Sequence, residues 1–226
     1  MERAMSKIKA KELLSGRWAN AVGAVALFFI VAAFGNAILA ILPFIGFILG
    51  GLLAYYFKLS FNKYCVKLNE TDERVKYNEC FLDALTFFKT MGAQILTGIV
   101  VFIIPFIIIM VGMFQMMSSF DGTFGMVIVV IGVIVELIFA IYYSLTFFTI
   151  PFIFIEDDEI GVIDGIKRAM AISKGFKWKY FVFLLSFIGW YLLACITFGI
   201  GLLWLSPYFV LSTFLFYKHM TEKKTI

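Results

Sequence analysis

Long apolar runs alternate with polar segments along this chain of 226 residues. The apolar runs lie at 18–57, 90–155 and 180–217, and each is long enough for two helical membrane crossings of about 20 residues. The pattern therefore predicts six transmembrane helices, paired as three hairpins. We place these spans at about 19–42, 44–61, 91–117, 124–155, 180–198 and 200–217.

The basic residues orient the predicted hairpins. All 19 Lys and Arg residues fall in four polar segments, which are 1–17, 58–89, 156–179 and the tail from 218. The turns between paired spans contain none. Cytoplasmic loops retain Lys and Arg, and two crossings return the chain to its starting side. We therefore expect all four segments and both termini to be cytoplasmic.

Composition also indicates a membrane protein. Apolar residues make up 62% and charged residues 15% of the chain, whereas soluble domains are about half apolar and about a quarter charged. The net charge of +4 favours contact with anionic inner-leaflet lipid rather than with nucleic acid. The expected fold class is all-α, a polytopic membrane helix bundle that forms one integral membrane domain over residues 1–226.

Amphipathic helical patterns occur in three of the polar segments, at 6–14, 78–88 and 162–170. Each places apolar residues on one helical face and polar residues on the other, and Asn78 is a suitable N-cap for the second. We interpret all three as interfacial helices on the cytoplasmic membrane surface.

A cation and an indole stand together at two junctions between an interfacial helix and a span. These pairs predict interfacial anchors, because Trp and basic side chains settle at the headgroup level. The four expected anchors are Arg17, Trp18, Lys177 and Trp178. We interpret Trp190 and Trp204, in the last predicted hairpin, as packing and interface residues rather than as parts of a ligand site.

Glu136 is the only formally charged residue deep in a predicted span. An ionised carboxylate is costly in lipid, so we expect Glu136 to face the bundle and to be protonated or bound by a donor such as Asn36. Proton or cation handling at this intramembrane polar site is one hypothesis. A structural hydrogen bond between helices is the other.

Residues that suit other chemistry are sparse. Cys65, Cys80 and Cys195 have no metal-ligand spacing, and neither a disulfide nor a zinc site is expected. The acidic run 156–159 has carboxylates that suit a divalent cation, but compensation of a helix amino terminus is the favoured interpretation. Because no acid, base and nucleophile occur together, we expect a non-enzyme without metal or cofactor.

The carboxyl-terminal part of the chain resembles a known family. The segment 169–179 reads Ala-Met-Ala-Ile-Ser-Lys-Gly-Phe-Lys-Trp-Lys, and Gly-Ile-Gly-Leu-Leu-Trp follows at 199–204. With Pro207-Tyr208, these residues are similar to the DUF975 family of bacterial integral membrane proteins over about 145–217. The resemblance implies a multi-pass protein of the bacterial plasma membrane, with no general activity and no catalytic residues assigned. Many members have Pro-Gly where this chain has Val135-Glu136, so it implies no family-wide role for Glu136.

The sequence thus favours a non-catalytic membrane protein that binds lipids, peptides or partner membrane proteins in envelope homeostasis or resistance to membrane-active peptides. The alternative is a small transporter or channel component that uses Glu136 as an intramembrane ionisable site. A membrane-embedded enzyme acting on lipid is disfavoured. Expected partners are membrane lipids and other membrane proteins, such as a transporter. No nucleic acid is expected, and no oligomeric state is indicated.

Overall fold

The computed structural model describes residues 2–42, 45–71, 73–118 and 122–225, and all regular secondary structure in these ranges is helical. The predicted all-α class is therefore confirmed for these ranges. In chain order the elements are α1 (Glu2–Leu14), α2 (Trp18–Leu39), α3 (Ile45–Glu70), η1 (Tyr77–Cys80), α4 (Ala84–Ser118), α5 (Thr123–Phe147), α6 (Ile150–Glu156), α7 (Val162–Ser173), α8 (Lys177–Leu185), α9 (Ile188–Ile196) and α10 (Leu202–Thr225).

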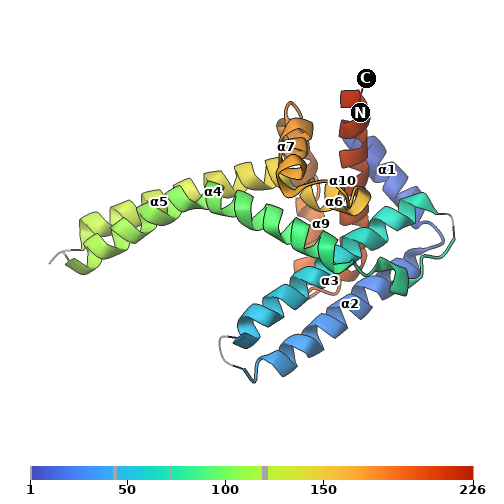
Figure 1. Ribbon diagram of the computed structural model, residues 1–226, viewed down its shortest axis with the longest axis horizontal. Helices are drawn as coiled ribbons and strands as arrows, with labels where there is room; N and C mark the ends of the chain where they lie inside the picture. The colour runs from blue at the N-terminus through green and yellow to red at the C-terminus, as the bar shows by residue number, and fades with distance from the viewer. Residues whose placement is uncertain (1, 43–44, 72, 119–121, 226) are drawn as a thin grey trace.

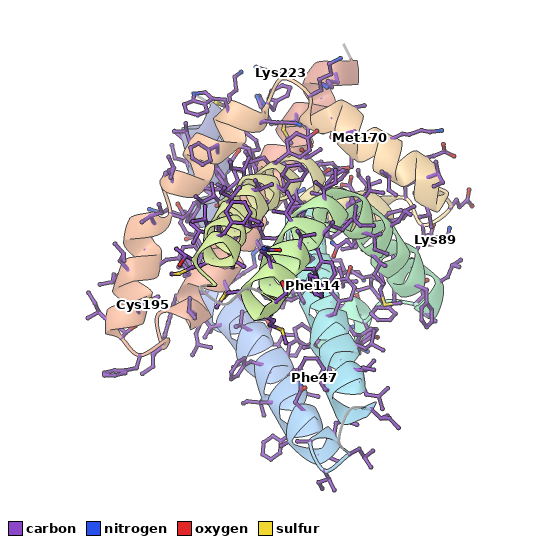
Figure 2. All side chains as sticks on the ribbon, turned by 90° about the vertical axis from the view of Figure 1, so that its left-hand side faces the viewer. Phe47, Lys89, Phe114, Met170, Cys195 and Lys223 are labelled. Atoms are coloured by element: carbon purple, nitrogen blue, oxygen red, sulfur yellow. The ribbon has the colours of Figure 1, made fainter. Side chains whose placement is uncertain are left out.

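Three helix pairs extend from a shared hub (Figure 1). The pairs are α2 with α3, α4 with α5, and α9 with α10. The hub consists of α1, η1, α6, α7 and the carboxyl-terminal halves of α3 and α10. It holds the largest fully buried side chains, among them Tyr64, Phe154 and Tyr217. Figure 2 shows Lys223 near the hub, whereas Phe47 lies toward the far end of its pair.

Among the described residues, five helical segments are long and apolar enough to cross a membrane. They are Trp18–Leu39, Ile45–Glu70, Ala84–Ser118, Thr123–Glu156 and Lys177–Ile196. These segments match the first five predicted spans. The sixth predicted span forms a helix, α10, but it is not in this set, because the carboxyl-terminal half of α10 is rich in polar and charged residues.

The predicted interfacial helix at 78–88 is wrong as a separate element. Asn78 lies in η1, and α4 begins at Ala84 and continues without interruption to Ser118. The N-cap is Asp83, whose carboxylate accepts the Thr86 N–H at 2.8 Å. Hydrogen bonds from α3 side chains to the carbonyls of residues 81 and 82 hold the preceding segment against α3.

Two of the spanning segments are interrupted. The first contains a turn at Phe148–Thr149 between α5 and α6, next to Pro151. The second breaks at Ser186–Phe187, between α8 and α9, and this break was not predicted. There the Lys7 ammonium donates hydrogen bonds to the Ser186 carbonyl at 3.2 Å and to the Ser186 hydroxyl at 2.6 Å. A cation from α1 thus satisfies a carbonyl at the carboxyl end of α8.

Glycines allow the paired helices to approach closely. A Cβ atom at Gly125 of α5 would lie 2.4 Å from the backbone nitrogen of Met116 in α4. A Cβ atom at Gly50 of α3 would lie 2.1 Å from the Asn36 side-chain oxygen in α2. Small residues at such positions are the usual basis of close helix packing in membranes.

Candidate functional site

Glu136 and Asn36, the predicted intramembrane polar pair, belong to different helix pairs. Glu136 lies half-buried on α5, and Asn36 lies on α2, where its amide donates to the Ala32 carbonyl at 2.8 Å. Asn36 also faces Gly50 of α3. The suggested hydrogen bond between Glu136 and Asn36 is therefore not formed.

Glu136 lies at the level of Pro105 on the neighbouring helix. In the α4–α5 pair, Gly132 faces Ile109 and Gly125 faces Met116, and this antiparallel register continues to position 105 opposite position 136. Pro105 has no N–H, so one carbonyl of α4 lacks its usual helical donor nearby. No hydrogen bond or ion pair to the Glu136 carboxylate occurs in the described parts of the chain.

The nearest polar cluster of the same pair joins α4 and α5. The Tyr143 hydroxyl donates to the Gln94 carbonyl at 3.2 Å and lies 3.4 Å from the Thr97 hydroxyl. Tyr143 is about two helical turns from Glu136. These polar groups therefore serve contact between the helices and do not converge on the carboxylate.

Arg17, one of the expected anchors, joins two parts of the hub. Its guanidinium donates to the Leu68 carbonyl at 3.3 Å and to the Thr71 carbonyl at 2.6 Å. These carbonyls lie at the carboxyl end of α3, where a cation is electrostatically favoured. Arg17 therefore caps α3 as well as standing at the junction before α2.

Lys177 and Trp178 begin α8. The Lys177 ammonium lies 3.9 Å from the centre of the Tyr142 ring, and the Trp178 side chain is 73% exposed. The indole of Trp178 contacts the ring of Phe181 on its own helix. Their role as anchors at a membrane surface stays a prediction.

The acidic run 156–159 pairs with cations of the chain itself. Glu156 accepts hydrogen bonds from the Lys218 ammonium at 2.5 Å and from the Tyr217 hydroxyl at 2.9 Å. Asp157 pairs with Arg168 at 3.1 Å. Only Glu156 of this run belongs to α6, and residues 157–159 lie between α6 and α7. Compensation at the amino terminus of α7 stays a prediction. The part of the chain that the structure describes contains no group of residues suited to a metal ion.

Hydrogen bonds join all four basic segments to one another. Arg17 connects segment 1–17 to segment 58–89. The Lys89 ammonium donates to the Asp158 carbonyl at 2.5 Å, which connects the second segment to the third. Lys218 pairs with Glu156, and Lys224 donates to the Ala171 carbonyl, so the tail joins the third segment. The four segments therefore lie at one end of the molecule.

Three of the four tryptophans line one cavity of about 300 Å³, which we call the tryptophan pocket. It lies between α1, the start of α2, and the α9–α10 pair. The residues that define it are Lys11, Trp18, Trp190, Trp204, Leu205 and Tyr208. Sequence reasoning missed this site because its indoles come from distant segments without a shared motif. Trp190 and Trp204, interpreted from the sequence as packing and interface residues, line this cavity.

Comparison with known proteins gives one match. The model of the family described as "Protein of unknown function (DUF975)" matches residues 1–224. No curated protein and no solved structure matches the chain.

Proposed function

Because the chain belongs to the DUF975 family, to which no function is assigned, we propose a function from the geometry of the chain itself. We propose a multi-pass protein of the bacterial plasma membrane that binds membrane components and is not an enzyme. Its ligands are lipids, peptides or partner membrane proteins, and its role is envelope homeostasis or resistance to membrane-active peptides.

The proposed topology has six crossings, arranged as three hairpins, with both termini in the cytoplasm. The observation that carries it is the joining of all four basic segments by Arg17, Lys89 and Lys218. Segments in direct contact lie on the same side of a membrane, so an even number of crossings separates them. The turns at the far ends of the pairs contain no Lys or Arg, as expected for translocated segments.

In this proposal α10 makes the sixth crossing despite its polar residues. The α8–α9 segment leads away from the hub, and α10 leads back to it, where Lys218 meets Glu156. The middle of α10 is covered by other helices, since Leu211, Phe214 and Leu215 are buried. A helix surrounded by protein needs less lipid-facing apolar surface than one exposed to the bilayer.

The interfacial part of the proposal rests on α7. This helix buries Ile166, Ala169 and Ile172 in the hub and exposes Ile163 and Met170. Exposed apolar side chains beside cations suit the surface of an anionic membrane. The helix α1 packs against α10 instead of standing free.

The polar side chains of the spans mainly form hydrogen bonds within and between helices. This use favours binding over catalysis or transport as the function of the chain. Hydroxyl groups of Thr97 and Thr146 donate to carbonyls of their own helices, and Ser173 donates to the Thr146 carbonyl at 2.6 Å. These groups support the helices and their contacts. Glu136 alone favours the second candidate function, a small transporter or channel component.

Flux measurements separate the two candidates. The purified chain is reconstituted in liposomes that enclose a pH-sensitive dye, and proton flux is followed after a pH step. If the chain is a binding protein, liposomes that contain the wild type or Glu136→Gln show the same proton flux as protein-free liposomes. A pH-dependent flux that Glu136→Gln abolishes would replace the binding proposal with the transporter.

Cell sensitivity tests the proposed role. Deletion is expected to change survival in the presence of a cationic membrane-active peptide, and the Glu136→Gln chain is expected to restore wild-type survival. Unchanged survival after deletion contradicts the resistance role.

A further inference from the structure

We propose that the tryptophan pocket binds one anionic phospholipid of the cytoplasmic leaflet. The headgroup contacts Lys11, and part of one acyl chain lies between Trp190 and Trp204. This inference rests on the proposed membrane function and adds a site and a ligand class to it.

The pocket has an apolar base and aromatic walls. Ala194, Leu205 and Tyr208 are buried beneath it, whereas Trp190 and Trp204 are about half exposed. Exposed indoles beside a cavity give an entering apolar chain a large contact area. The site is therefore open to a ligand from its surroundings.

Hydrogen-bond donors outnumber acceptors among the side chains that line the pocket. Lys11 lies at its edge, 5.7 Å from the centre of the Tyr208 ring, and no acidic residue is among the described residues that line it. In the described ranges, Lys11 forms no hydrogen bond or ion pair, and the indole N–H groups of Trp18 and Trp190 donate to no protein atom.

Side-chain acceptors are few in the lining of the pocket, and one of them is already partly used. The Thr197 hydroxyl donates to the Ala194 carbonyl at 2.9 Å and accepts the Gly201 N–H at 3.0 Å. A peptide backbone brings a donor with every acceptor, and apart from the Thr197 and Tyr208 hydroxyls the lining side chains offer its N–H groups no acceptor. A phosphate diester with ester carbonyls brings acceptors and a negative charge, which complement the ammonium and the indole N–H groups.

The size of the cavity fits part of a lipid better than a folded partner. About 300 Å³ lies at the lower limit of small-molecule sites, which span roughly 300–1,000 Å³. Each buried methylene of an acyl chain contributes about 0.8 kcal/mol, so a short length of chain provides substantial affinity. The charge at Lys11 then selects among lipids with similar chains.

The fold also gives the lipid a direction. Lys11 belongs to α1 in the hub, which the proposed topology places at the cytoplasmic surface. Gly201 lies in the connection between α9 and α10, and Trp204 lies in the first turn of α10. A headgroup at Lys11 therefore leaves its chain directed toward Trp204 and the connection between α9 and α10.

Tryptophan quenching by brominated lipids tests the site in the full chain. Two variants are compared in nanodiscs, each with Trp→Phe at the other three positions so that the pocket keeps aromatic walls. One retains only Trp190, which lines the pocket, and the other retains only Trp178, which is exposed outside it. Brominated phosphatidylglycerol is expected to quench Trp190 more strongly than brominated phosphatidylcholine at equal mole fraction. The preference for the anionic lipid is expected to be smaller at Trp178, which lies beside Lys177 at the surface and outside the pocket. Equal quenching of Trp190 by both lipids overturns the proposal.

Native mass spectrometry of bound phosphatidylglycerol tests the charge without changing an indole. Lys11→Gln is expected to weaken binding about fivefold, since a basic residue near an anionic membrane contributes about 1 kcal/mol. The control Lys9→Gln removes the same charge from the same helix at a position outside the pocket, and it is expected to stay within about twofold of the wild type. Equal weakening in both variants overturns the proposal.

The two levels of the proposal fail differently. If no brominated lipid quenches Trp190 or Trp178, the chain is not embedded in the bilayer and the membrane function fails. If both indoles are quenched without preference for the anionic lipid, the membrane function stands and the pocket assignment fails.

Discussion

The close approach of α4 and α5 predicts a large difference between two Gly→Ala substitutions. Gly125 of α5 contacts the backbone of α4, and an added Cβ would lie 2.4 Å from the Met116 nitrogen, 2.7 Å from its Cα and 2.8 Å from the Gly112 carbonyl oxygen. Gly98 of α4 has no such neighbour within 4 Å of an added Cβ. The same chemical change is therefore harmful at one position and harmless at the other.

The magnitude follows from two opposing effects. All three neighbours of the Gly125 Cβ belong to the backbone, so the two helices must separate by about 1 Å to reach ordinary contact. Overpacking of this kind costs about 1–3 kcal/mol. Replacement of Gly by Ala in a helix interior returns about 1 kcal/mol, and Gly125, in the first turn of α5, gains no more from it than Gly98 in the interior of α4. We therefore expect Gly125→Ala to be less stable than Gly98→Ala by about 1–3 kcal/mol.

The assay is unfolding of the purified chain in mixed micelles with increasing SDS, followed by far-ultraviolet circular dichroism. The free energy of unfolding is compared between Gly125→Ala, Gly98→Ala and the wild type. The reasoning is refuted if the two variants agree within about 0.5 kcal/mol, because the backbone contact between α4 and α5 would then be absent.

Two further predictions concern the cap of α4 at Asp83 and the contact of α1 with Ser186. The Thr86 N–H holds the pKa of the Asp83 carboxyl below its ordinary value of 3.8, so the ionised cap stabilises the fold above that pH and is lost as pH falls through the lowered pKa. Asp83→Ala is expected to lower the free energy of chemical unfolding by about 1 kcal/mol at neutral pH. In strong acid the variant and the wild type are expected to have the same free energy of unfolding. A difference between them that stays constant at all pH values contradicts this. Loss of the Lys7 contacts to Ser186 is expected to release α1, so Lys7→Ala increases tryptic cleavage after Lys11 about tenfold. The control Lys174→Ala leaves the cleavage rate unchanged, and equal rates in the two variants contradict the docking of α1.

Much of the helical architecture could be predicted from local pattern. The runs that form α2, α4 and α5 are apolar over the length of a crossing, which is the pattern of a transmembrane helix. The bend near Pro151 was predictable because proline cannot continue a helix through its own position without loss of a hydrogen bond. These features depend on residues that are close in the sequence.

Features set by distant contacts could not be predicted. The end of α3 lies beyond the predicted limit of the second span because Tyr64 and Leu68 are buried in the hub. Asp83 caps α4 in place of Asn78, because side chains of α3 donate hydrogen bonds to the carbonyls of residues 81 and 82 and keep this segment out of the helix. The tryptophan pocket joins Trp18 to Trp204 across most of the chain, and neither residue belongs to a periodic pattern that indicates the other.

The most direct measurement is labelling of single cysteines in intact cells with a membrane-impermeant maleimide, in a chain without its three native cysteines. The account predicts that Ile200→Cys, in the turn between α9 and α10, reacts from outside. It predicts that Glu73→Cys and Lys223→Cys, in the second basic segment and the tail, react only after permeabilisation. Reaction of Glu73→Cys or Lys223→Cys in intact cells, or reaction of all three positions from the same side, would contradict the topology.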